Sequence, residues 1–577
     1  MKILLVAINA KYIHSNLAVY NLAAYAGRYS AEVEIAEFTI NHYVEYILEE
    51  IYKKKPDVIA FSCYIWNFNY IKELVGDLNK LLPDVPIWIG GPEVSYDSLE
   101  LLEKFPQIKG VMVGEGEKTF CELATHYVDQ SIALDCIKGI LFRNDNDEIE
   151  TNEPRELMNM DDIPFCYSDM DKFKNKIIYY ETSRGCPFSC SYCLSSIDKR
   201  VRFRSLELVE KELKYFMNHK IPQVKFVDRT FNCNANHSRA IWRYILENDN
   251  GITNFHFEIG ADLLKAEDLE IMSRMRPGLI QLEIGVQSTN ISTIHEINRA
   301  MDFNALKDVV EKINSMGNIH QHLDLIAGLP YEGYDSFRKS FNDVYCLNPE
   351  QLQLGFLKVL KGSNMHEWAD KYGIIYRTNP VYEVLYTKWL NHDELLAIKK
   401  VEEMVELYYN SRQFTNTVKW LSKVFESPFD CFQLLGNFYE ERGYSGVSQS
   451  RMTRYDILLE FSEKYDKQNI ELYKELLLYD LYLRENLKAR PSWAADLTEY
   501  KEVIKEFYIQ EDEERNYLTD YEGFHYKQLS KMTHVEVFSS EGFINAKTDG
   551  KVMILFDYNK RNPLTYEAFT QMVGELE

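Results

Sequence analysis

The chain has 577 residues, of which 46% are hydrophobic and 27% charged, enough apolar sequence for roughly three or four packed domains. A formal net charge of −24 argues against a protein that binds nucleic acid or an anionic membrane mainly by electrostatics, although a local basic groove is compatible with it. The sequence has no uninterrupted apolar run long enough for a transmembrane helix. Ten scattered or clustered cysteines do not make a disulfide framework in a chain this large, so we expect a cytoplasmic, reduced protein.

The first part of the chain, residues 1–140, alternates short apolar runs with helical patterns. The apolar runs lie at 2–9, 31–38, 57–66, 85–91 and 110–117. Strands that alternate with amphipathic helices predict a doubly wound parallel sheet, with its ligand beyond the carboxyl ends of the strands. The apolar stretch at the start of the sequence is interrupted by Lys11 and lacks a cleavage site of small residues, so it predicts a buried strand rather than a signal peptide.

Three further regions follow along the chain. Residues 141–175 are turn-rich and predict a linker or a small hairpin. Residues 176–365 contain six strand-like runs separated by amphipathic helices, which predicts a partial (β/α)6 barrel of the TIM type with its site at the strand C-termini. Residues 366–577 are dominated by helical patterns, with two strand-like runs near the end, and predict a mainly α-helical domain with a terminal β-hairpin.

The strongest chemical signal is the segment ETSRGCPFSCSYCLSS, which holds Cys186, Cys190 and Cys193 within eight positions. A compact loop can direct all three sulfurs to a common centre. Structural zinc sites usually have four ligands. A [4Fe–4S] cluster bound by only three cysteines leaves one iron open for another ligand. The alternatives are a zinc site with a distant fourth ligand, or three incidental thiols.

The C-x3-C-x2-C spacing, after the first strand of the expected barrel and with Tyr192 before the last cysteine, resembles the radical S-adenosylmethionine (SAM) superfamily. The resemblance implies a [4Fe–4S] cluster whose open iron chelates SAM, and reductive cleavage of SAM to a 5′-deoxyadenosyl radical. It also implies SAM contacts at later strand ends, although the usual Gly-Gly-Glu motif is absent. The candidates, each of which has a turn or core residue as its alternative, are Asp228, Glu258, Gln287, Ser288 and Gly328.

The N-terminal region resembles cobalamin-binding domains, whose nucleotide tail enters a slot lined by small residues. Adjacent glycines permit the close approach of a flat base. The matching small residues are Ser62, Gly90, Gly91, Gly114 and Gly116.

One position departs from the cobalamin pattern. Domains that ligate cobalt carry D-x-H-x-x-G in the first loop, whereas here Tyr12 and Leu17 replace the Asp and the Gly around His14. Without an orienting carboxylate a cobalt–His14 bond is disfavoured. His14 is therefore a candidate contact to cobalamin or substrate, with a rim residue of no special role as the alternative.

Together the two resemblances imply a cobalamin-dependent radical SAM enzyme that methylates an unactivated carbon of a small molecule. A reduced flavodoxin or ferredoxin would donate the electron, and we expect no membrane and no nucleic acid as partner. Three alternatives stay open. They are radical rearrangement or redox chemistry without methyl transfer, modification of tRNA or another RNA, and a cobalamin sensor that does no catalysis.

Overall fold

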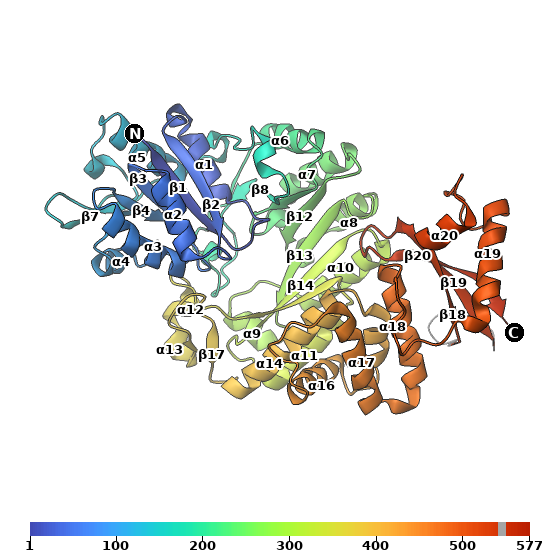
Figure 1. Cartoon of the computed structure of the whole chain (residues 1–577). Coiled ribbons are helices and arrows are strands. Elements are labelled where there is room, and N and C mark those ends of the chain that lie inside the picture. Colours follow the sequence, from blue (N-terminus) through green and yellow to red (C-terminus); the bar gives the residue numbers. More distant parts are fainter. Residues whose placement is uncertain (540–549, 577) are drawn as a thin grey trace. The chain divides into compact units, whose positions relative to one another are not determined.

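The computed structural model describes residues 1–539 and 550–576 (Figure 1). The chain forms two compact units. The first consists of Met1–Tyr334 and Gly355–His392, and the second of Asp335–Leu354 and Asp393–Glu577. None of the described helices is long and apolar enough to cross a membrane.

The first sheet of the first unit has seven strands in the order β2-β1-β3-β4-β5-β6-β7. Its five parallel strands are β1 (Ile3–Asn9), β2 (Val33–Thr39), β3 (Val58–Ser62), β4 (Ile87–Gly90) and β5 (Ile108–Met112). The helices between and after them are α1 (Leu17–Tyr25), α2 (Val44–Lys53), α3 (Phe68–Leu81), α4 (Ser98–Lys104) and α5 (Gly116–Val128).

Alternating side chains of β1 enter two separate hydrophobic cores. Leu4 and Val6 pack with side chains of α2, α3 and α4, whereas Ile3 and Leu5 pack with side chains of α1 and α5. Successive strand residues point to opposite faces, so the apolar run of β1 is explained by helices on both faces of a parallel sheet. The predicted doubly wound fold is confirmed.

Residues 141–175 are predicted to form a linker or a small hairpin, and the structure has a hairpin at the start of this stretch. Strands β6 (Ile140–Arg143) and β7 (Ile149–Thr151) form an antiparallel hairpin that extends the first sheet beyond β5. The first domain therefore includes residues up to 151. The turn residues between β6 and β7 close this hairpin.

The second sheet contains the six predicted strands, in the order β15-β14-β13-β12-β11-β8. The strands are β8 (Ile178–Tyr180), β11 (Gln223–Phe226), β12 (Asn254–Ile259), β13 (Ile280–Gln287), β14 (His320–Ala327) and β15 (Gln351–Phe356). Each neighbouring pair from β8 to β14 is parallel. Helices that follow these strands include α6 (Leu206–Asn218), α7 (Ala235–Glu247), α8 (Ala266–Ser273), α9 (Ile291–Glu296) and α10 (Phe303–Met316). The partial barrel is confirmed.

The second unit is mainly helical, as predicted. Its helices include α15 (Thr415–Leu421), α16 (Pro428–Glu441), α17 (Arg451–Tyr465), α18 (Ile470–Arg484), α19 (Lys501–Glu514) and α20 (Tyr526–Met532). The expected terminal hairpin is instead a three-stranded antiparallel sheet of β18 (Thr533–Phe538), β19 (Lys551–Arg561) and β20 (Ala568–Leu576). Most of β20 is exposed or half-buried, so it lacks the continuous apolar run that marked β19. Residues 540–543 of the run predicted as the first strand lie outside the described residues.

The predicted domain boundary at 366 also differs from the structure. Residues 366–392 belong with the first unit. The contacts responsible come from this segment and the residues just before it: the Tyr382 hydroxyl donates to Glu93, and Lys361 Nζ lies 2.6 Å from Asp97 Oδ2. Both carboxylates lie on the first domain, so charge pairing attaches the segment to it.

Candidate active site

The cysteine segment is a loop closed at its base by a short strand pair. Strand β9 (Ser183–Arg184) pairs antiparallel with β10 (Arg202–Phe203). Gly185 opens the loop with a φ of +93°, and a Cβ there would lie 2.7 Å from the Arg200 carbonyl oxygen. This position therefore requires glycine. Cys186 and Cys190 are each 8% exposed, so a cluster held here is shielded from bulk water.

A buried arginine lies against the cysteines. Arg299 Nη1 lies 3.9 Å from Cys190 Sγ and donates to the Tyr192 hydroxyl at 3.2 Å. Burial raises the pKa of the Cys190 thiol, and the Arg299 charge opposes that rise. A cation beside a thiol favours the thiolate, which is the form that ligates iron. Arg299 follows α9 and had no motif around it, so the sequence did not reveal it.

The three thiols lie near enough to influence one another electrostatically. All three cysteines are free, and Cys190 has Cys186 and Cys193 as electrostatic neighbours. Within the described residues, no three His, Cys, Asp or Glu side chains converge as ligands of one metal ion. An iron–sulfur cube binds each thiolate to a different iron, so its ligands need not converge in this way.

Asp228 is wholly buried at the end of β11. Its carboxylate accepts hydrogen bonds from Thr182 N (3.1 Å), Thr182 Oγ1 (2.7 Å) and Ser183 Oγ (2.6 Å). Burial raises its pKa to about 6, and these hydrogen bonds oppose the rise. Asp228 thus holds the strand that leads into the cysteine loop, while its contact to SAM stays a prediction.

The other predicted SAM residues lie at the ends of neighbouring strands. Ser288 is wholly buried and donates to Glu332 Oε1 at 2.7 Å. Gln287 ends β13 with a φ of +70°. Gly328 follows β14, and a Cβ there would lie 2.8 Å from a methyl group of Val384. The structure thus brings Gln287, Ser288 and Gly328 to the carboxyl end of the barrel, as the strand order predicts, and their SAM contacts stay predictions.

Small residues gather at the carboxyl edge of the first sheet. Ser62 and Gly90 are direct neighbours on β3 and β4. Gly91 has a φ of +116°, and a Cβ there would lie 2.5 Å from the Cys63 carbonyl oxygen. Gly114, in contrast, has no atom within 4 Å of a built Cβ, so the rim is open above it. Gly116 begins α5.

Aromatic rings at the same edge complete a surface that suits a flat ligand. Tyr64 and Trp66 stack with ring centroids 4.3 Å apart and planes 8° from parallel, and Trp66 is 38% exposed. Open space over Gly114 and a stacked aromatic pair with one exposed ring fit a corrin and its nucleotide tail. Asn67, which the sequence analysis missed, is wholly buried and donates to the Ile8 and Ser62 carbonyls, so it joins two strand ends of this rim.

His14 reaches the barrel rather than a carboxylate of its own domain. Its Nδ1 lies 2.6 Å from the Tyr179 hydroxyl, and its backbone forms a bridge to Ile177 at the start of β8. Burial and nearby lysines lower the pKa of His14, which favours a neutral imidazole. Tyr179 thus orients the His14 ring, and a contact of His14 to cobalamin or substrate stays a prediction.

Ion pairs join the first domain to the cysteine loop. Arg184 Nη2 lies 2.5 Å from Glu117 Oε1, and Arg202 Nη2 lies 2.6 Å from Glu115 Oε1. Arg184 and Arg202 are the register partners that close the loop. The glycine-rich loop after β5 is therefore attached directly to the base of the cysteine loop.

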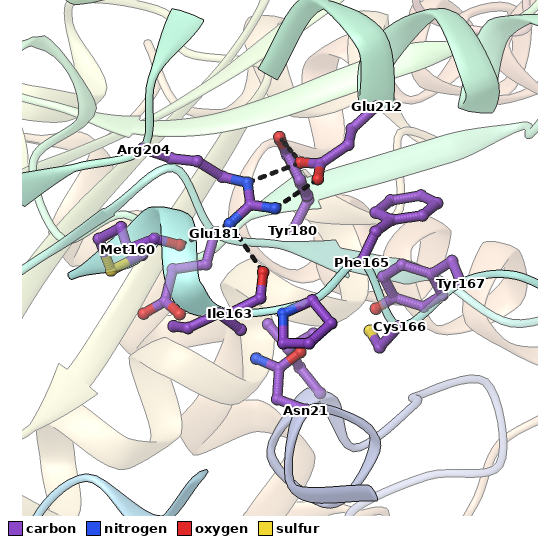
Figure 2. A pocket seen from close by; sticks show the side chains of 12 residues that line it. Asn21, Met160, Ile163, Phe165, Cys166, Tyr167, Tyr180, Glu181, Arg204 and Glu212 are labelled. Carbon is purple, nitrogen blue, oxygen red and sulfur yellow. Dashed lines mark hydrogen bonds and ion pairs between the residues drawn. The ribbon is translucent and has the colours of Figure 1, made fainter. Parts of the chain in front are cut away.

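A small cavity beside this contact has a structural role. Its volume is about 30 Å³, room for about one water molecule. Figure 2 shows Arg204 directed at the Glu212 carboxylate, with Tyr180 on the same group. Arg204 also donates to the Ile163 carbonyl at 3.0 Å. The cavity is too small for SAM or a substrate, and its residues attach the linker to α6.

Three family models match the chain. The B12 binding domain matches residues 3–124, the radical SAM superfamily matches 180–344, and a protein family of unknown function, DUF4080, matches 370–556. The chain thus matches a cobalamin-binding domain model and, after it, a radical SAM domain model. The first two models also imply its cofactors, which are cobalamin, SAM and a [4Fe–4S] cluster.

Curated relatives match the first two domains. The chain is 26% identical over 355 residues to the cobalamin-dependent radical SAM methyltransferase TokK of Streptomyces tokunonensis, covering 56% of this chain and 50% of that protein. It is 23% identical over 332 residues to an anaerobic magnesium-protoporphyrin IX monomethyl ester cyclase of Synechocystis, covering 56% and 64%. The chain thus spans about half the length of TokK.

Solved structures share the fold. The cobalamin-dependent SAM radical enzyme OxsB, with aqua-cobalamin and SAM bound, has a TM-score of 0.57 at 16% identity over 83% of this chain and 79% of that chain. The radical SAM methyltransferase TsrM of Kitasatospora setae has a TM-score of 0.55 at 16% identity over 66% and 79%. At this identity the likeness concerns the fold.

Proposed function

We propose that this protein is a cobalamin-dependent radical SAM methyltransferase that acts on an unactivated carbon of a small molecule. The observation that carries the proposal is the attachment of the glycine-rich loop to the base of the cysteine loop through Arg184 and Arg202. It sets the expected cobalamin edge of one domain beside the expected cluster of the other. The name of TokK supports methyl transfer as the reaction.

When bound, the cluster with SAM would supply a carbon-radical initiator and cobalamin a methyl group, the combination that an inert C–H bond requires. Cys186, Cys190 and Cys193 would hold the cluster, and Arg299 would balance thiolate charge beside it. The small residues of β3, β4 and the loop after β5 would hold the cobalamin tail. Glu117 and Arg184 would keep the two sites at a constant separation.

The reaction also needs an electron donor, and a second type of radical chemistry is a candidate. A reduced flavodoxin or ferredoxin would donate the electron. The relative named as a cyclase supports non-methylating radical chemistry as the second candidate. The two candidates differ in one product, because only methyl transfer consumes SAM to S-adenosylhomocysteine.

Cofactor content and products test the proposal together. After anaerobic reconstitution with iron, sulfide and hydroxocobalamin, we expect about four irons per chain and one cobalt. Both 5′-deoxyadenosine and S-adenosylhomocysteine should then form from SAM. Iron without cobalt contradicts the methyltransferase. Iron and cobalt with 5′-deoxyadenosine alone, in the presence of a turned-over substrate, favour the second candidate.

A further inference from the structure

The inner face of the barrel carries polar side chains where barrels of this type usually pack branched aliphatic ones. Strand register places Lys225 beside His256, and Glu283 between Glu258 and His322. Asp324 lies two residues beyond His322 and so shares its face. We call these residues the inner polar row: Lys225, His256, Glu258, Glu283, His322 and Asp324.

Contacts on the two faces of the sheet identify the inner one. Tyr180 bonds Glu212 of α6, and Phe257 meets Trp242 of α7 at a ring-centroid distance of 6.2 Å. These residues therefore point to the helix-covered face. Tyr179, the register partner of Lys225, points the opposite way and meets His14 of the first domain. The inner polar row shares the face of Tyr179, toward the cobalamin edge.

Within the row, two groups are paired and one carboxyl is not. Glu283 Oε2 lies 2.9 Å from Lys225 Nζ and 3.0 Å from His256 Nε2, and His322 Nε2 lies 3.1 Å from Asp324 Oδ1. Glu258 has no hydrogen bond or ion pair with any described residue. The half-buried Glu258 carboxyl is therefore free to pair with a ligand group.

Charge indicates what that group is. The row holds three carboxyl groups, one lysine and two histidines. Glu283 engages the lysine and His256, and Asp324 faces His322, which leaves Glu258, among the described residues, without a cation beside it. Arg229, at the exposed end of β11, acts on Glu258 only at a distance. Burial and the charge of Glu283 raise the pKa of Glu258 to about 7, so a nearby cation would return it to its charged form.

We propose that the inner polar row binds the substrate through a basic nitrogen, an amine or guanidinium cation, which pairs with Glu258 and shares Asp324 with His322. This inference rests on the proposed function, which makes the bound molecule the substrate, and it assigns Glu258 to the substrate in place of the SAM contact predicted from the sequence. An apolar substrate would leave these carboxyls buried against hydrocarbon. A carboxylate or phosphate would meet an excess of like charge.

Binding of three small probes tests the inference without turnover and without SAM. Saturation-transfer NMR on the reconstituted full chain compares n-butylammonium, butyrate and butan-1-ol, at about 0.15 M salt to screen surface charge. We expect saturation of n-butylammonium only. Glu258→Gln and Asp324→Asn should each weaken it about tenfold, the loss of one charge-assisted hydrogen bond. Glu207→Gln, on the exposed side of α6, is the matched control.

Equal binding of butyrate or butan-1-ol overturns the inference, as does n-butylammonium binding that survives both isosteric variants. Melting temperatures of the variants show whether each remains folded, and the second variant serves if one does not. Selective n-butylammonium binding in a protein that forms no S-adenosylhomocysteine would support the cation site and contradict the methyltransferase. Methyl transfer without cation selectivity would support the methyltransferase and contradict the cation site.

Discussion

The cysteine loop and the rim of the first domain are both expected to hold cofactors, but they do so by different physics. The loop would supply three covalent ligands within eight positions, and each would be required. The rim supplies shape, through small residues on β3, β4 and the loop after β5, with an aromatic pair beside them. Replacing a cysteine ligand should therefore abolish cluster binding. Changing the shape of the rim should only weaken cobalamin binding.

The largest effect should come from the loop. Cys190→Ala removes one of three iron ligands, so we expect loss of the cluster and of all 5′-deoxyadenosine formation. Cobalt content should stay at the wild-type level, because the rim is untouched. Cys346→Ala, at an exposed thiol, is the control. Retained SAM cleavage in Cys190→Ala would show that Cys190 is not a required cluster ligand.

The next effect concerns the contact between the two regions. Arg184→Met leaves the Glu117 carboxylate, only 6% exposed, without its partner. Breaking a buried pair in this way costs about 3–5 kcal/mol of unfolding free energy, measurable by denaturant titration. Lys53→Met, at an exposed pair, should cost less than about 1 kcal/mol. Equal losses of unfolding free energy in the two variants would show that the Arg184–Glu117 pair contributes no more than an exposed ion pair.

A pH profile sharpens the role of Asp228. Its pKa is raised from 3.8 to about 6, so between these values the folded state binds more protons than the unfolded state. The stability of the wild type should therefore fall, relative to Asp228→Asn, as pH rises from about 4 to 6, by up to about 3 kcal/mol at 1.36 kcal/mol per pKa unit. Parallel melting profiles of the two proteins would contradict this assignment.

The smallest effect should come from the rim. Gly91→Ala places a Cβ 2.5 Å from the Cys63 carbonyl oxygen, and a backbone atom cannot rotate away. We expect the edge to shift and cobalamin affinity to fall about tenfold, or about 1.4 kcal/mol, by spectroscopic titration. Gly114→Ala, at a φ of +82°, meets no protein atom of the described residues within 4 Å, so it measures backbone strain unless the cofactor occupies that space. A complete loss of cobalamin in Gly114→Ala would mean that its open space is itself occupied by the cofactor.

The sequence by itself determined the local features of this protein. Three cysteines in one loop need only spacing to predict a cluster, and strands alternating with helices need only periodicity to predict both parallel sheets. Gly90 and Gly91 could be placed at a strand end for the same reason. Each of these signals lies within a few residues of chain, where covalent geometry limits the alternatives.

Only the tertiary structure decided which distant residues meet. Arg184 pairs with Glu117 and His14 with Tyr179, and β6 and β7 join the first sheet instead of forming a linker. The residues of the inner polar row come from four strands. The sequence of each of these strands, taken alone, has the alternation of an ordinary half-buried strand. Contacts across such separations depend on how the sheets pack, because periodicity tells which residues share a face but not what that face meets.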